Sequence, residues 1–187
     1  MKNKLNVIAV QSEYSMNIQD NLIKATKIIE EYGNDSDLIV FPELYSVGYY
    51  MDKKYLNETA EPINGDFIEN IKLLALKNGV FIAMPFLEKC KGKLYNSVAI
   101  INKSGKVIGV KRKAINWKTE LGYISEGELS KELEIYEIDG LKLGVLICYE
   151  ASFPETSRIL AEKGCDFIIV PSFWSNDALN HWNIQLR

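Results

Sequence analysis

The chain has 187 residues, 47% hydrophobic and 25% charged, which is the composition of one ordinary globular domain covering residues 1–187. Its formal net charge is −3, with 22 basic against 25 acidic side chains, so no positive excess argues for binding to nucleic acid or an anionic membrane. No apolar run approaches the roughly 20 residues that span a bilayer, and the N-terminal run is too short for a secretion signal. We therefore expect a cytoplasmic protein.

Apolar, β-branched runs of strand length recur along the whole chain. They cover residues 6–10, 38–41, 80–84, 97–101, 107–110, 133–138, 142–147 and 167–170. Most are continuous rather than alternating, which is typical of strands that are buried on both faces. The sequence therefore predicts a sheet structure covered by other elements.

Helical patterns lie between several of these strands. Residues 17–32 and 66–77 place apolar side chains on one stripe, with charges on the opposite face. Residues 152–155 (Ser-Phe-Pro-Glu) read as a capping box that opens a third helix, which we expect to end near residue 163, before Gly164. Turn residues at 103–105 and 139–140 predict two hairpins. Strands that alternate with helices, together with hairpins, indicate an α/β fold with a mixed sheet.

The three cysteines, Cys90, Cys148 and Cys165, do not form a Cys-x-x-Cys pair, and His181 is the one histidine. An odd number of cysteines without a secretion signal argues against a disulfide framework, and this ligand set argues against zinc. We expect neither a metal nor another cofactor.

Cys148 ends the apolar run of residues 143–147, and polar residues and a helix follow it. Ligands of sheets with parallel strands bind at the carboxyl ends of those strands, so this thiol is a candidate nucleophile, although a lone cysteine is most often structural. His181 is a weak partner for it, because it lies among the last seven residues in a helical stretch. A carboxylate is the alternative partner.

Two charged residues follow other strands. Glu43 comes directly after an apolar strand and a proline, where burial would make it a capable general base; capping the next segment is the alternative. Lys113 belongs to a Lys-Arg-Lys run whose alternation puts Arg112 on one face of the strand and Lys111 with Lys113 on the other. Its ammonium could stabilise an oxyanion, and the alternative is an ordinary solvated strand edge.

Taken together, these segments resemble the nitrilase superfamily of carbon–nitrogen hydrolases. The matching segments are residues 41–43, 95–97, 111–113, 120, 127, 147–150, 153–155, 158, 164–166, 171–174 and 181–182. Each match is weak alone, but their order and spacing along essentially the whole chain are specific.

The resemblance implies a role for each matching site residue. Cys148 would be the nucleophile, Glu43 the general base and Lys113 the oxyanion stabiliser. Glu120 matches the additional glutamate that accompanies the lysine, and the backbone N–H of Tyr149 would complete the oxyanion hole. No metal takes part.

The resemblance also implies a four-layer α-β-β-α sandwich, a dimer or higher homo-oligomer, and a small amide, carbamoyl compound or nitrile as substrate. A thioester on the cysteine would be the intermediate, and water would hydrolyse it. Acyl transfer to an amine is one alternative function, and an inactive fragment or binding subunit is another. Among the aromatic residues, Tyr49 and Trp174 are candidates to line the substrate pocket, or they belong to the core.

The chain departs from the superfamily pattern in two respects. Ile115 stands where a histidine is frequent, and residues 113–117 together with 148–149 are closer to aliphatic amidases. Members of the superfamily also continue well past Arg187, so we expect the last strands of the sandwich to be missing, which would leave sheet edges exposed.

Overall fold

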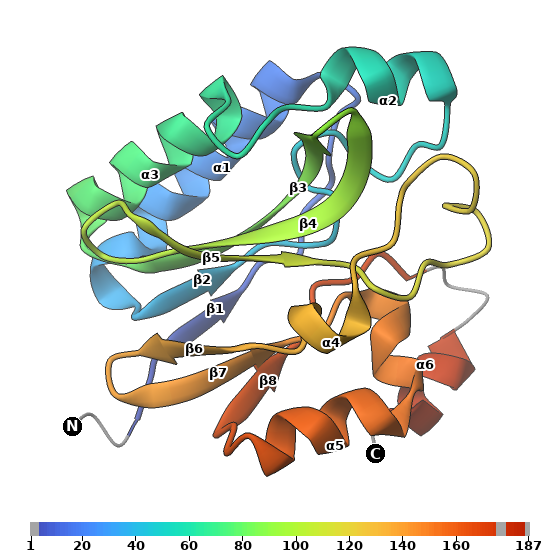
Figure 1. The fold of residues 1–187 in the computed structure, drawn as a ribbon. Helices are drawn as coiled ribbons and strands as arrows, with labels where there is room; N and C mark the ends of the chain where they lie inside the picture. The colour runs from blue at the N-terminus through green and yellow to red at the C-terminus, as the bar shows by residue number, and fades with distance from the viewer. Residues whose placement is uncertain (1–3, 175–178, 186–187) are drawn as a thin grey trace.

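The apolar runs form strands that assemble into two facing sheets in the computed structural model, which describes residues 4–174 and 179–185 (Figure 1). In the described residues the first sheet has the order β1-β2-β3-β4-β5, parallel from β1 to β3 and antiparallel from β3 to β5. These strands are β1 Val7–Ala9, β2 Leu38–Val40, β3 Phe81–Cys90, β4 Lys93–Ile101 and β5 Val107–Arg112. The first sheet is therefore mixed, as the sequence predicts.

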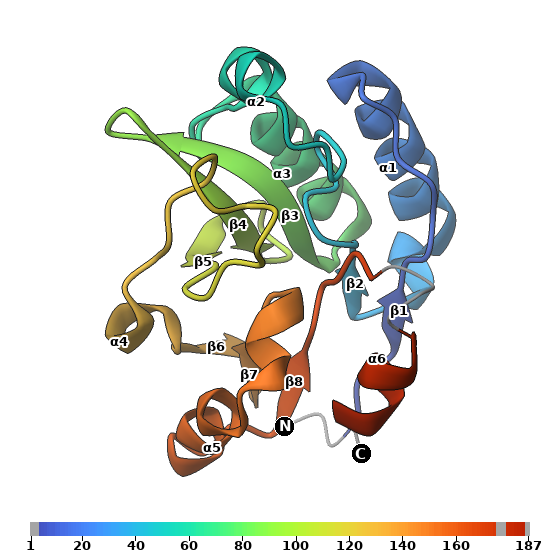
Figure 2. The same cartoon turned by 90° about the vertical axis from the view of Figure 1, so that its right-hand side faces the viewer.

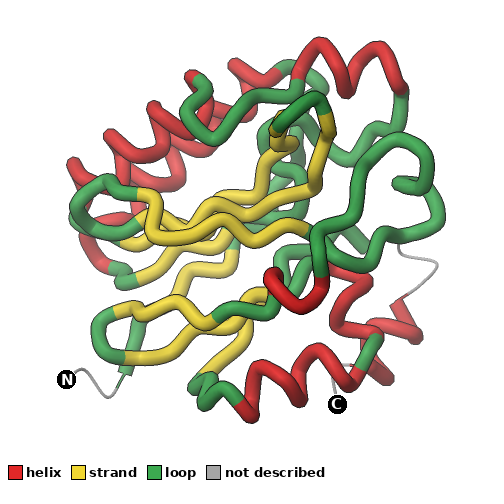
Figure 3. The backbone as a smooth tube through the Cα atoms, in the orientation of Figure 1, coloured by secondary structure: helices red, strands yellow, loops and turns green. Residues whose placement is uncertain are grey.

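The second sheet is smaller and also mixed. Its described strands are β6 Ile135–Ile138, β7 Leu141–Val145 and β8 Phe167–Ile169. The β6–β7 pair is antiparallel and the β7–β8 pair is parallel. The two sheets lie face to face, with the chain crossing between them after β5 (Figures 1 and 3).

Helices cover the outer faces of both sheets. Helices α1 (Ile18–Tyr32) and α3 (Asp66–Asn78) pack on the first sheet, and α5 (Pro154–Glu162) lies outside the second (Figures 1 and 2). The shorter helical elements are α2 Lys53–Thr59, α4 Leu129–Glu132, α6 Leu179–Gln185 and the 3₁₀ turns η1 Gly33–Asp35 and η2 Cys148–Ser152. The expected α-β-β-α sandwich is thus confirmed.

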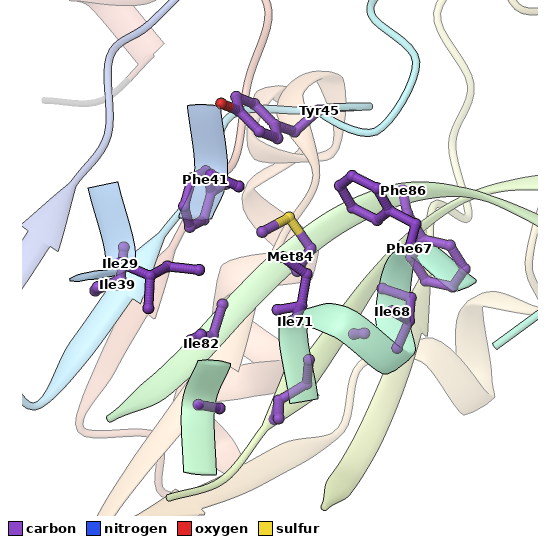
Figure 4. Close-up of a cluster of buried hydrophobic side chains, with 14 of the residues drawn as sticks. Ile29, Ile39, Phe41, Tyr45, Phe67, Ile68, Ile71, Ile82, Met84 and Phe86 are labelled. Carbon is purple, nitrogen blue, oxygen red and sulfur yellow. The ribbon is translucent and has the colours of Figure 1, made fainter. Parts of the chain in front are cut away.

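Three apolar layers hold the four structural layers together. The layer between α1, α3 and the first sheet contains Ile29, Ile71 and Met84 (Figure 4). Between the two sheets, residues of the first such as Val98 meet residues of the second such as Leu143. The layer between the second sheet and α5 is Leu133, Leu146 and Leu160 with their partly buried neighbours. Each fully buried aliphatic side chain contributes about 1.5–3 kcal/mol relative to an exposed one.

Two sequence expectations about element boundaries need correction. Helix α5 begins at Pro154, and its N-cap is Phe153, whose side chain makes no capping bond; the predicted capping box is wrong because Ser152 still belongs to the 3₁₀ turn η2. Strands β3 and β4 also run on to a hairpin at Lys91 and Gly92, both of which have positive φ. The sequence does not predict this extension, because proline usually argues against a strand interior and Pro85 lies within β3. Polar residues also follow Pro85.

The two hairpins that the sequence predicts are present. Residues 103–105 connect β4 to β5, and Asp139 and Gly140 connect β6 to β7. Helix α1 begins at its predicted N-cap, Asn17, whose side chain accepts bonds from the next turn. In the part of the chain that the structure describes, no helix is long and apolar enough to cross a bilayer.

Candidate active site

The Cys148 thiol lies in the turn that leaves β7, at the interface of the two sheets. Its side chain is buried, and its φ of +48° places a non-glycine residue in the left-handed region. Such a conformation costs on the order of 1–3 kcal/mol and persists where the surrounding structure fixes it. The backbone N–H of Cys148 donates to Pro171 O at 3.0 Å. The turn is therefore anchored to the segment after β8.

Glu43 follows β2 and is fully buried. Its Oε1 accepts from Lys113 Nζ at 2.7 Å, and its Oε2 accepts from the backbone N–H of Phe173 at 2.9 Å. The next residue, Leu44, also has a positive φ, of +50°. Like the cysteine, this carboxylate sits at a conformationally strained turn after a strand.

Lys113 follows β5, and its ammonium lies between two carboxylates. Its Nζ is 2.7 Å from Glu43 Oε1 and 2.5 Å from Glu120 Oε2, and all three side chains are fully buried. Burial by itself would lower the pKa of Lys113, but the charges of Glu43 and Glu120 outweigh it and raise that pKa above its ordinary value. The lysine therefore stays protonated and cationic.

Alternation along β5 predicts the environment of its last residues correctly. Lys111 and Lys113 are both fully buried, whereas Arg112 points to the other face and pairs with Glu88 at 2.6 Å. The alternative of a solvated strand edge is thus excluded for both lysines.

Asn96 completes the polar cluster, although the sequence did not single it out as a site residue. Its side-chain amide donates to Glu43 Oε1 and to Glu120 Oε1, at 2.9 Å in both cases. The sequence does contain an indication of this role, because alternation places Asn96 on the same strand face as the buried Val98 and Ile100. A polar residue at such a position needs partners in the core.

The Cys148 thiol and the Glu43 carboxylate meet at the backbone of Phe173. The thiol donates to Phe173 O at 3.8 Å, while the N–H of the same residue donates to Glu43. Burial raises the pKa of Cys148 well above its ordinary value, the charge of Glu43 adds to this, and the charge of Lys113 opposes it. At neutral pH the resting sulfur is therefore a thiol.

Aromatic rings lie around this cluster. The Tyr149 ring contacts that of Trp117, with centroids 4.8 Å apart, and Tyr49 stacks on Phe173 at 5.3 Å. The Tyr49 hydroxyl also lies 3.0 Å from Thr119 Oγ1. Burial, followed by the charge of Glu120, raises the pKa of Tyr49, which agrees with a ring close to the acidic cluster.

Trp174 lines a hollow that it shares with Phe173. Its ring is 5.1 Å from that of Trp182, and both line a hollow of about 730 Å³ whose described lining does not include Cys148, Glu43 or Lys113. The structure thus brings together the predicted triad and Glu120, and Phe173 links this cluster both to Tyr49 and to the hollow that Trp174 lines. The side chain of His181 lies outside the described residues.

A mixed-sheet α/β sandwich with a buried cysteine, glutamate and lysine at its strand ends defines a narrow class of protein. The chain belongs to the carbon-nitrogen hydrolase family, whose family model matches residues 6–187, and so to the nitrilase superfamily.

Relatives and solved structures of this family are similar over nearly the whole chain. A citrullinase from Francisella tularensis is 31% identical over 95% of this chain and 67% of its own length, and a 2-oxoglutaramate amidase from Bacillus subtilis is 33% identical over 89% and 64%. The structure of Nit3 from Saccharomyces cerevisiae superposes with a TM-score of 0.83 at 25% identity, covering 97% of this chain and 69% of Nit3. The chain thus spans about two thirds of the length of these relatives.

Proposed function

We propose that this protein hydrolyses an amide-type C–N bond of a small molecule through a thioester on Cys148. The observation that supports this most is the single buried cluster in which Phe173 joins the thiol to Glu43 and Glu43 joins Lys113. A nucleophile, a base and a fixed cation are the groups that acyl transfer needs.

In the first step, Glu43 takes the proton of the Cys148 thiol while the sulfur attacks the carbonyl carbon. An S–C bond forms, and the π electrons of the carbonyl move to its oxygen. Because the pKa of Cys148 is raised, a free thiolate is scarce in the resting protein. Proton transfer is therefore coupled to attack rather than completed before it.

The oxyanion that forms is stabilised by Lys113 and by the backbone N–H of Tyr149. The N–H of Cys148 is already used by Pro171 O, so we assign this role to the next amide along the turn, that of Tyr149. Glu120 and Asn96 hold the ammonium and the base in place. Removal of one such donor typically reduces the rate on the order of 10²–10³-fold.

The tetrahedral intermediate then collapses to the thioester. Its C–N bond breaks, and the proton on Glu43 moves to the departing nitrogen, which leaves as ammonia or an amine. Glu43 next takes a proton from water, and the hydroxide attacks the thioester carbon. The C–S bond breaks, the sulfur regains the proton, and a carboxylic acid leaves.

The names of the relatives favour small carboxamides and ureido compounds over other substrates. A citrullinase and a 2-oxoglutaramate amidase are both among them. We accordingly propose a carboxamide or carbamoyl substrate first, with a nitrile as the third class.

Intact-mass measurement tests this function. The wild-type chain is incubated with a panel of small amides, ureido compounds and nitriles, and we expect an acyl adduct on Cys148 together with released ammonia. Cys148→Ala abolishes both, while Cys165→Ala, which changes the half-buried Cys165 at the other end of α5, retains both. Turnover by Cys148→Ala at the wild-type rate would refute the proposal. Addition of an amine distinguishes hydrolysis from acyl transfer by its product.

A further inference from the structure

A second buried ion pair lies beside the proposed triad and has no part in the steps above. Lys111 Nζ is 2.7 Å from Glu150 Oε1, and both side chains are fully buried. Burying two charges carries a desolvation cost of several kcal/mol per ion, and well-packed apolar residues often stabilise a core equally well. Stability alone is therefore a weak reason for this pair.

The Glu150 carboxylate bonds to the backbone at two points next to the proposed catalytic residues. Its Oε2 accepts from the N–H of Ile147, and its Oε1 accepts from the N–H of Ala114, each at 2.7 Å. Ile147 immediately precedes Cys148, and Ala114 immediately follows Lys113. One carboxylate thus ties the nucleophile turn on one sheet to the lysine strand on the other.

The turn that Glu150 closes is the strained one. Cys148 has its φ of +48° between Ile147 and Glu150, and the N–H of Glu150 donates back to Ile147 O at 3.1 Å. The Thr156 hydroxyl of α5 donates to Glu150 O at 3.0 Å. Both the side chain and the backbone of Glu150 therefore hold residues 147–150 in one conformation. That conformation in turn fixes the direction of the Tyr149 N–H.

Lys111 supplies the charge that this carboxylate needs. It lies on the same face of β5 as Lys113, and its Nζ also donates to Arg112 O at 2.7 Å. Without it, Glu150 would be an uncompensated buried charge in a core that already holds Glu43 and Glu120. The ammonium balances the charge of the carboxylate whose oxygens accept from both backbone amides.

We infer that Lys111 and Glu150 are positioning residues that set the separation between the nucleophile and the oxyanion lysine. This inference rests on the proposed role of Cys148. In this role the Lys111–Glu150 pair does not contact the substrate. The pair acts through the backbone of residues 147–149 and of residues 113–114. Misplacement of reacting groups by about 1 Å can lower a rate on the order of 10²-fold.

The test compares two reactions of the same thiol in the full 187-residue chain. Acylation by p-nitrophenyl acetate requires the oxyanion donors, whereas alkylation by iodoacetamide does not. The variant is the double substitution Lys111→Met/Glu150→Gln, which removes both charges and leaves one side-chain oxygen to accept from the turn. Glu88→Gln/Arg112→Met is the matched control, because Arg112 lies on the opposite face of β5 from Lys111 and pairs there with Glu88 of β3.

We expect acylation of Cys148 in the double variant to fall about 10- to 100-fold, with alkylation within about threefold of wild type. The control should retain both rates, and thermal unfolding shows that each variant is folded at the assay temperature. Unchanged acylation in the folded variant, or an equal loss in the control, would overturn the inference. Wild-type chain that is never acylated at Cys148 overturns the proposed function, and the inference with it. If either variant fails to fold, Glu150→Gln alone is compared with Glu88→Gln under the same criteria.

Discussion

Asn96 Nδ2 lies 2.9 Å from Glu43 Oε1 in the core, although the two residues are 53 positions apart in the chain. The same amide group donates to Glu120, so one neutral side chain spaces two carboxylates on either side of Lys113. This arrangement holds the proposed base in place without adding a charge.

Substitution Asn96→Leu should therefore damage both stability and activity. It removes two hydrogen bonds to charged groups, each contributing roughly 1.5–3 kcal/mol, so we expect a loss of about 3–6 kcal/mol in the free energy of unfolding. Urea denaturation measures this, and kcat should fall as well. Ser97→Ala is the control, because Ser97 donates to the buried Glu88 on the other face of β4. The Ser97→Ala variant should be less stable than the wild type but keep its kcat. A loss of kcat equal to that of Asn96→Leu would contradict the prediction.

Removal of the base charge should separate thiol ionisation from catalysis. The charge of Glu43 raises the pKa of Cys148, so Glu43→Gln should lower that pKa, because Lys113 still favours the thiolate. We expect the pH profile of iodoacetamide alkylation to shift to lower pH while amide turnover is lost. An alkylation profile of Glu43→Gln that moves to higher pH would contradict the prediction, because it would mean that the charge of Glu43 does not raise the pKa of Cys148.

Lys113→Met should be among the most damaging substitutions in the cluster. It leaves Glu43 and Glu120 facing each other without a cation, and breaking a buried ion pair costs about 3–5 kcal/mol. The rate of acylation should also fall on the order of 10²–10³-fold. Chemical denaturation and single-turnover kinetics give the two quantities, and Lys118→Met, outside the cluster, should leave both near wild type.

The free energy of unfolding should fall at alkaline pH. Burial raises the pKa of Cys148, so the folded chain keeps a proton that the unfolded chain releases above about pH 8.5. The unfolded state then binds fewer protons, and stability is lost as pH rises. The raised pKa of Lys113 adds a further loss above about pH 10.4 by the same argument. Denaturation between pH 7 and 11 should show a shallower initial fall for Cys148→Ala, and an identical curve would contradict this.

The aromatic residues give a test of where the substrate lies. Tyr49 stacks on Phe173, which bonds to both the thiol and the base, whereas Trp174 lines a hollow that Phe173 borders and whose described lining does not include Cys148, Glu43 or Lys113. We expect Tyr49→Ala to raise KM about tenfold with a smaller change in kcat, as lost apolar and ring contacts of 1–2 kcal/mol imply. Tyr49→Phe and Trp174→Ala should stay near wild type. A larger effect from Trp174 would place the substrate in the hollow that Trp174 and Trp182 line.

The amino-acid sequence determined the strands, the long helices and the order of the motifs. Continuous apolar runs such as residues 38–41 predict buried strands, and alternation alone put Lys111 and Lys113 on one face of β5. Local patterns suffice for these properties, because each depends on neighbours within a few residues.

Only the tertiary structure decided which polar groups meet. The bond between Phe173 and Glu43 joins residues 130 positions apart, and the one between Ala114 and Glu150 joins two different sheets. No local pattern predicts that the fold buries Glu120 completely, or that the Glu150 carboxylate closes the Cys148 turn. Packing of two separate sheets creates these contacts, and the periodicity of a single segment carries no information about the segment it will face.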